Sequence, residues 1–116
     1  MIKTIAVARR KEGMTHEDFI EYWGEKHAPL VVKTWPGLRK YVQDRTIIEP
    51  GQPYDADGIV EMWYDDLAAM KKAMAWVQSE AGRPLREDGD KFCDLRAGGF
   101  WVVEEYVVKD ELSGKH

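Results

Sequence analysis

The order in which two hydrophobic periods alternate along this chain constrains its fold more than any other feature. The period of two that is typical of strands occurs in four segments: 2–8, 38–48, 58–64 and 100–109. The 3.6-residue period of helices occurs in two segments, one from 16 towards Pro29 and one from 67 to 82. The predicted order is therefore strand, helix, strand, strand, helix, strand.

This order is that of the ferredoxin-like plan, an α+β fold written βαββαβ. Both helices then cover one face of a four-stranded antiparallel sheet. A further short helical segment is expected within 84–96, anchored by Leu85, Phe92 and Leu95.

Length and composition narrow the number of domains and the classes of partner. We expect a single domain over residues 1–110, followed by a polar tail at 111–116, because 116 residues suffice for one core. The net charge is -4 and the basic residues are scattered, so a nucleic-acid partner is not expected. With one cysteine, Cys93, and no signal-like or membrane-spanning apolar run, the chain is expected to be cytoplasmic and away from membranes.

The first helix has a strong start signal in the sequence. Thr15 and Asp18 have the spacing of a capping box, and Met14 and Phe19 have that of a hydrophobic staple. The helix is therefore predicted to begin at His16.

A histidine and a proline follow on the inward face of this helix. Spacing by four links Trp23, His27 and Val31, so His27 is predicted to point towards the sheet. Pro29 has no N–H, and we expect the helix to kink or end there, leaving a gap with His27 at its edge. His27 then either bonds a freed backbone carbonyl and closes the core, or acts as a general base.

Both faces of the third and fourth predicted strands are largely apolar. The alternation places Ile59, Glu61 and Trp63 opposite Val60, Met62 and Tyr64, and Trp101, Val103 and Val107 opposite Phe100, Val102 and Val108. Helices cover only one face, so a monomer would leave large apolar side chains in water at about 1.5–3 kcal/mol each. We therefore predict a homodimer packed through the open sheet face, in which Glu61 needs a partner.

Five segments in order resemble one known family. They are Thr15 to Val31 (TxxxFxxYWxxxHAPLV), Trp35 to Gln43 (WPGLRKYVQ), Asp57 to Leu67 (DGIVEMWYDDL), Glu87 to Phe92 (EDGDKF) and Phe100 to Val108 (FWVVEEYVV). Together they are similar to the EthD family of the dimeric α/β barrel superfamily, over nearly the whole chain. The resemblance implies a ferredoxin-like subunit, a barrel formed by two sheets, and a small pocket between helices and sheet in each subunit.

The resemblance also implies candidate site residues. A related cofactor-free isomerase of aromatic degradation uses a histidine and a tyrosine that match His27 and Tyr41, which implies that these two are catalytic. Its pocket cysteine matches Met62, which cannot act as an acid, base or nucleophile, so that enzyme's own reaction is not expected here. The expected substrate contacts are Trp23, Met62, Tyr64 and Glu104.

The leading hypothesis is a cofactor-free isomerase or lyase for a small hydrophobic carbonyl or aromatic compound, such as a lactone, a polyketide or an intermediate of aromatic catabolism. In this hypothesis His27 moves a proton and Tyr41 stabilises an oxyanion. The alternatives are a cofactor-independent monooxygenase and a non-catalytic dimer that binds a hydrophobic ligand or supports an assembly.

Other polar residues have roles that the sequence leaves open. Glu104 and Glu105 point to opposite faces of the last strand, so one of them either orients His27 or is an edge charge. Arg9 either holds an anionic substrate or is a solvated surface residue. Cys93 is expected to be a small buried side chain. The three histidines show no ligand spacing, so no metal or other cofactor is expected.

Overall fold

The chain folds with the predicted βαββαβ order, and the computed structural model describes residues 1–94 and 98–112. Its strands are β1 (Ile2–Ala8), β2 (Lys40–Arg45), β3 (Gly58–Tyr64) and β4 (Phe100–Glu104). Its helical elements are α1 (His16–Tyr22), the π-helical turn η1 (Trp23–His27), α2 (Ala28–Thr34), α3 (Leu67–Gln78), the 3-10 turn η2 (Glu80–Gly82) and α4 (Arg83–Asp90).

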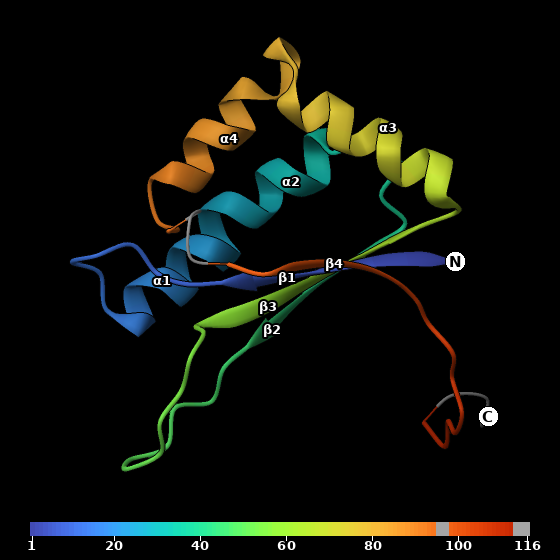
Figure 1. Ribbon diagram of the computed structural model, residues 1–116. Coiled ribbons are helices and arrows are strands. Elements are labelled where there is room, and N and C mark those ends of the chain that lie inside the picture. The colour runs from blue at the N-terminus through green and yellow to red at the C-terminus, as the bar shows by residue number, and fades with distance from the viewer. Residues whose placement is uncertain (95–97, 113–116) are drawn as a thin grey trace.

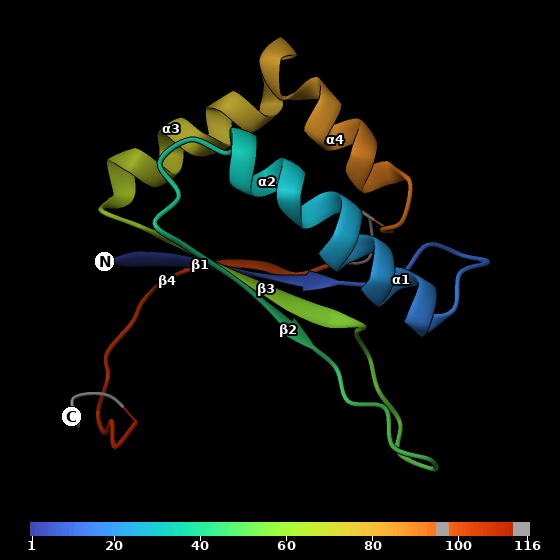
Figure 2. The same ribbon diagram turned by 180° about the vertical axis from the view of Figure 1, so that it is seen from behind.

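The four strands form one antiparallel sheet in the order β2-β3-β1-β4. The helices of the described residues all lie against one face of this sheet (Figures 1 and 2). This arrangement is the ferredoxin-like α+β architecture. On β2, Tyr41 and Gln43 face the helices, because they pair with Met62 and Val60 of β3. Within the described ranges, no helix is long and apolar enough to cross a membrane.

Two strands are shorter than their sequence patterns. Glu104 pairs with Ile2, the first residue of β1, so the chain beyond Glu104 has no strand to pair with. The prediction of a strand over 100–109 is therefore wrong past Glu104. β2 stops at Arg45, opposite the first residue of β3, so the prediction of 38–48 was too long as well.

The first helix does not break at Pro29, and the predicted kink or end is wrong. The helix continues from α1 through η1 into α2, with the wide turn closed by a hydrogen bond from the Ala28 N–H to the Trp23 carbonyl. Pro29 then lies at the start of α2, where a missing N–H costs little. The predicted start is confirmed, because Thr15 Oγ1 accepts from the Asp18 N–H at 3.0 Å.

The elements α3 and α4 complete the helical layer. Asp66 caps α3 by accepting a backbone N–H one turn later at 2.8 Å. α3 ends at Gln78, earlier than predicted, and η2 joins it to α4. Of the predicted anchors that follow, Leu85 and Phe92 are buried, and Leu95 lies outside the described residues.

Two buried clusters fill the layer between helices and sheet. One is formed by Val31, Met62, Tyr64, Met70, Ala73 and Leu85. The other is formed by Ala8, Phe19, Trp23 and Phe92. The residues of β1 that face the helices include Thr4 and Ala6, whose side chains are small. Small side chains here leave space between the two clusters.

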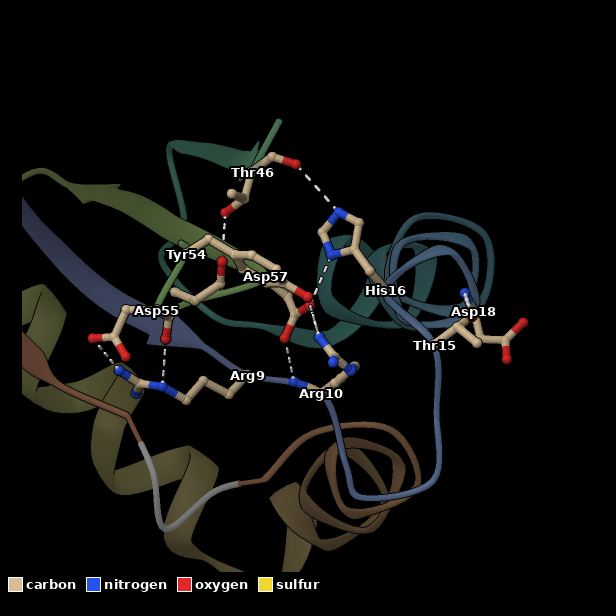
Figure 3. Close-up of polar contacts among 10 residues, drawn as sticks. Arg9, Arg10, Thr15, His16, Asp18, Thr46, Tyr54, Asp55 and Asp57 are labelled. Atoms are coloured by element: carbon tan, nitrogen blue, oxygen red, sulfur yellow. Dashed lines mark hydrogen bonds and ion pairs between the residues drawn. The ribbon is translucent and has the colours of Figure 1, made fainter. Parts of the chain in front are cut away.

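A polar cluster fixes the start of α1 to the connection between β2 and β3 (Figure 3). The His16 ring lies between the Asp57 carboxylate, 2.7 Å from Nδ1, and the Thr46 carbonyl, 3.2 Å from Nε2. Asp57 also accepts from the backbone N–H of Arg10 at 2.8 Å. Burial alone would raise the pKa of Asp57, but the hydrogen bonds from His16 and Arg10 outweigh it and lower that pKa. Both ring nitrogens of His16 are engaged, so this cluster is a structural clamp.

The open face of the sheet is less apolar than its sequence pattern predicts. Glu61 finds its expected partner within the same chain, because Lys3 Nζ lies 2.9 Å from its Oε1. Lys3 and Lys40 lie over the Trp63 ring, 4.9 and 4.6 Å from its centroid, and only 8% of Trp63 is exposed. Around this polar centre, exposed apolar side chains remain at Ile59 (39%) and Trp101 (52%).

Candidate functional site

A cavity of about 270 Å³ lies between the helices and the sheet. Members of both buried clusters line it, and its walls are mostly apolar, with Trp23, Val31, Met62 and Phe92 among them. The polar side chains of the lining are Thr4, His27, Tyr41 and Cys93. Among the described residues, no Asp, Glu, Lys or Arg lines this cavity.

His27, the last residue of η1, reaches the cavity from the helical layer. Its ring packs against Phe92 with the centroids 4.9 Å apart, and its Nδ1 lies 2.8 Å from Oδ2 of Asp88. Within the described chain, Nδ1 is the ring atom with a hydrogen-bond partner, and no polar side-chain atom is buried without one. Nε2 is therefore accessible from outside the protein, on a residue that lines this cavity.

Asp88, on α4, fixes the tautomer of His27. Burial alone would raise the pKa of Asp88, but the hydrogen bonds from Tyr22 and His27 outweigh it and lower that pKa. Tyr22 donates its hydroxyl to Asp88 Oδ1 at 2.6 Å, and this bond is the main reason that the pKa of Tyr22 is raised to about 12. An ionised Asp88 only accepts hydrogen bonds, so His27 Nδ1 carries the proton and the neutral ring has its lone pair on Nε2.

Tyr41, on β2, lines the same cavity from the sheet side. Burial raises the pKa of Tyr41, against smaller opposing effects of Gln43 and Arg45, so the phenol stays protonated at neutral pH. Gln43 Nε2 donates to the Tyr41 oxygen at 2.9 Å. The cavity is therefore lined by a histidine from the helical layer and by a tyrosine from the sheet.

This arrangement suits a small ligand with one polar edge. A carbonyl oxygen near Tyr41 and an acidic proton near His27 would satisfy both groups. Since the described lining has no charged side chain, the cavity favours a neutral ligand. The described residues contain no group of three or more His, Cys, Asp or Glu side chains placed to hold a metal ion.

The family of the chain follows from a comparison with family models. The model described as the EthD domain matches residues 11–96. The chain belongs to the EthD family. A search of curated proteins gave no significant match.

Solved structures agree with this EthD assignment and with the fold. An EthD family protein from Bacillus halodurans C-125 is 27% identical, with a TM-score of 0.68 over 91% of this chain and 99% of that one. A dimeric protein of ferredoxin-like fold from Bacteroides fragilis is 10% identical, with a TM-score of 0.60 over 90% and 95% of the two chains. SnoaB, a cofactor-independent oxygenase from Streptomyces nogalater, is 9% identical, with a TM-score of 0.58 over 93% and 97%. The last two are similar in fold alone.

The cavity of this EthD protein brings together most of the residues that the sequence singled out: Trp23, His27, Tyr41 and Met62. Tyr64 is instead fully buried in the core, where it accepts from Trp35 Nε1 at 2.9 Å. Glu104 is exposed at the end of β4. Neither residue is part of the cavity lining, and their contact with a ligand stays a prediction.

Sequence reasoning missed the carboxylate that holds His27. The acid that contacts His27 is Asp88, and not Glu104 or Glu105. Glu105 instead binds Lys3 on the open face of the sheet at 3.1 Å. The signal was the EDGDKF segment at 87–92, which belongs to the resemblance, but the resemblance implied no role for its first aspartate, Asp88. Outside the cavity, Arg9 donates to the Asp55 carbonyl at 2.7 Å.

Cys93 was expected to be a small buried side chain, and it is half-buried. It lines the same cavity as His27, and burial raises the pKa of its thiol. The thiol is therefore protonated at neutral pH and packs in the cavity wall as a small uncharged side chain.

Proposed function

We propose that this EthD protein is a cofactor-free enzyme that transfers a proton on a small, neutral carbonyl compound. The observation that carries the proposal is the pairing of an open His27 Nε2 with the Tyr41 phenol on one apolar cavity. Asp88 supports it by keeping the proton on the far nitrogen of the ring.

The proposed reaction begins with His27 Nε2 removing a proton from carbon next to the carbonyl. The electron pair of that C–H bond moves onto the carbonyl oxygen, and Tyr41 donates a hydrogen bond to the resulting enolate. Return of the proton from His27 to another atom of the enolate gives an isomerisation. Departure of a leaving group next to the carbanion gives a lyase reaction. Asp88 stabilises the His27 cation that exists between the two steps.

The first experiment is a thermal-shift screen of neutral one-ring and two-ring ketones, followed by NMR of each binder in heavy water. Binding stabilises the folded protein by mass action. We expect bound ketones such as 2-tetralone to exchange the proton next to the carbonyl faster with the wild-type protein than with His27→Gln. Tyr41→Phe should slow the exchange at least about tenfold while the ketone still binds.

A non-catalytic dimer and an oxygenase each predict a different result from that of the proton-transfer enzyme. Equal exchange rates for bound ketones with wild type and His27→Gln would contradict the catalytic proposal and favour a non-catalytic ligand-binding dimer. The fold likeness to the oxygenase SnoaB supports a second candidate, attack of molecular oxygen on the same carbanion. Oxygen consumption with a phenolic binder, lost in His27→Gln, would favour that candidate over isomerase or lyase chemistry.

We also propose that two copies associate through the open face of the sheet. The support is the exposure of Ile59 and Trp101 on the face that no helix of the described residues covers, and the dimeric state of a structural neighbour. Association of the two faces removes this apolar surface from water.

A further inference from the structure

A glutamine outside the cavity lining, Gln43, donates a hydrogen bond to the Tyr41 hydroxyl oxygen. We propose that Gln43 is a positioning residue: it donates a hydrogen bond to the Tyr41 oxygen and accepts none from the Tyr41 hydroxyl, which leaves that hydroxyl as a hydrogen-bond donor for the bound ligand. The inference rests on the proposed function, in which Tyr41 contacts the ligand, and it adds a residue that acts through Tyr41.

Two neighbours fix the orientation of the Gln43 amide. The Trp23 backbone carbonyl lies 3.0 Å from one end of the amide and only accepts hydrogen bonds, so that end is the nitrogen. The Arg45 guanidinium lies 3.0 Å from the other end and only donates, so that end is the oxygen. Both contacts require the same orientation of the amide. In a flipped amide, the Gln43 oxygen would face the Trp23 carbonyl oxygen, and the Gln43 nitrogen would face the Arg45 guanidinium.

This orientation decides the role of the Tyr41 oxygen. The Gln43 nitrogen that donates to the Trp23 carbonyl also lies 2.9 Å from the Tyr41 hydroxyl oxygen. An amide nitrogen cannot accept a hydrogen bond, so Tyr41 accepts from it. The single proton of the phenol is then left to point elsewhere, and Tyr41 lines the cavity.

The π-helical turn and a glycine within it make this chain of contacts possible. The Trp23 carbonyl is the one that closes the wide turn η1, so the same turn that places His27 also anchors Gln43. A Cβ at Gly24 would collide with the Arg45 guanidinium. A glycine inside a helix costs about 0.5–1 kcal/mol relative to alanine. Here its missing side chain provides the space from which Arg45 holds the Gln43 oxygen.

The test reads the phenol directly and needs neither ligand nor turnover. A difluorotyrosine at position 41 moves the titration of the phenol into the range where the protein is folded, and fluorine NMR follows it. Removing the amide donor with Gln43→Leu should raise the pKa of this phenol by about one unit, since one hydrogen bond to the phenolate is lost. Gln43→Glu, of nearly the same shape, should raise it as well.

Two matched variants complete the experiment. Gln52→Leu makes the same change at an exposed loop glutamine and should leave the titration unchanged. Gly24→Ala displaces only the end of Arg45 and should shift the pKa in the same direction as Gln43→Leu, by a smaller amount. An unshifted pKa in folded Gln43→Glu or Gln43→Leu protein would overturn the inference.

The result is separable from that of the proton-transfer experiment. A shifted phenol titration supports the positioning role even if no bound ketone exchanges its proton faster than with His27→Gln. A ketone exchange that depends on His27, combined with an unshifted titration, would leave the enzyme proposal standing and remove Gln43 from it.

Discussion

At the scale of single residues, one carboxylate decides which nitrogen of His27 carries a proton. Asp88 holds Nδ1 at 2.8 Å and accepts a second hydrogen bond from Tyr22 at 2.6 Å. In the neutral ring of a histidine held in this way, the only basic atom is Nε2. In the proposed function, this basic atom removes a proton from the ligand.

Asp88→Asn tests this point. We expect proton exchange of a bound ketone to slow about 10–100-fold, because a neutral amide neither fixes the tautomer nor stabilises the His27 cation. The measurement is NMR exchange at saturating ketone. Tyr22→Phe is the matched control, since it removes the other hydrogen bond to Asp88 and should leave the rate close to that of wild type. An unchanged rate in Asp88→Asn would exclude the positioning role of this carboxylate.

The carboxylate pair Asp44 and Glu61 gives the folding stability a pH dependence. Its sign is opposite to that expected from Asp88, whose pKa is lowered in the folded protein. A hydrogen bond to Glu61, burial and the Glu61 charge raise the pKa of Asp44 to about 6, and the bond from Asp44 lowers the pKa of Glu61. The folded chain thus holds a proton on Asp44 that the unfolded chain, with a pKa of about 3.9, releases. The contribution of this proton to the free energy of unfolding is fully present below about pH 3.9 and is lost as the pH rises through about 6.

Asp44→Asn should therefore raise the melting temperature at about pH 7.5, and this gain should vanish by about pH 4. The amide keeps a donor to Glu61 and adds no charge. Thermal unfolding across this pH range measures the effect, with exposed Asp90→Asn as the control. A gain that is the same at both ends of the range would contradict the shared proton.

Sequence alone predicted some residues of the site and missed others for a physical reason. Helical spacing placed His27 on the inward face, and the resemblance to the EthD family singled out Tyr41. The contact of His27 with Asp88 joins residues 61 positions apart on two helices, and no local period reports it. The direction of the Gln43 amide depends on Arg45 and on a backbone carbonyl, which no sequence pattern describes.

At the scale of elements, the π-helical turn is the feature that joins the site to the fold. It lets the helix pass Pro29 without a break and places the Trp23 ring over Gly58 of β3, where a Cβ would lie 2.5 Å from that ring. The sequence predicted a disturbance near Pro29 but not its form, because a wide turn and a break both accommodate a missing N–H. Strand ends were overestimated because the start of the neighbouring strand sets them.

Gly58→Ala tests this packing. The new Cβ would lie 2.5 Å from the Trp23 ring and 2.8 Å from the Asp44 carbonyl oxygen, and neither is a flexible side-chain end. We expect the free energy of unfolding to fall by about 1–3 kcal/mol, measured by urea denaturation. Gly24→Ala is the matched control and should leave this free energy unchanged or raise it by about 0.5–1 kcal/mol. Equal effects of the two substitutions would contradict the close approach at Gly58.

At the scale of the whole molecule, the two faces of the sheet differ in what lies against them. The cavity lies on the helical side, and the open face carries Lys3 and Glu61 at its centre with Ile59 and Trp101 exposed nearby. Alternation in the strands predicted an apolar open face, but it did not predict that lysine side chains cover Trp63, since this contact crosses from strand to strand.

Trp101→Glu tests the proposed association. Sedimentation should show a dimer for the wild-type protein and a monomer for this variant, because a charge would be buried between two sheets without a partner. Val32→Glu, on α2 and 70% exposed, is the matched control and should remain a dimer. A monomeric wild-type protein, or dissociation by both substitutions, would contradict association through the open face.

The proposed function requires a basic nitrogen of His27 that faces a ligand cavity, and the ring nitrogens report on it directly. Nitrogen NMR of the imidazole in the neutral state should show Nδ1 protonated and Nε2 bare, with the Nε2 signal moving when a ketone binds. A ring protonated on Nε2, or one whose Nε2 signal ignores every ligand that stabilises the fold, would contradict the claim.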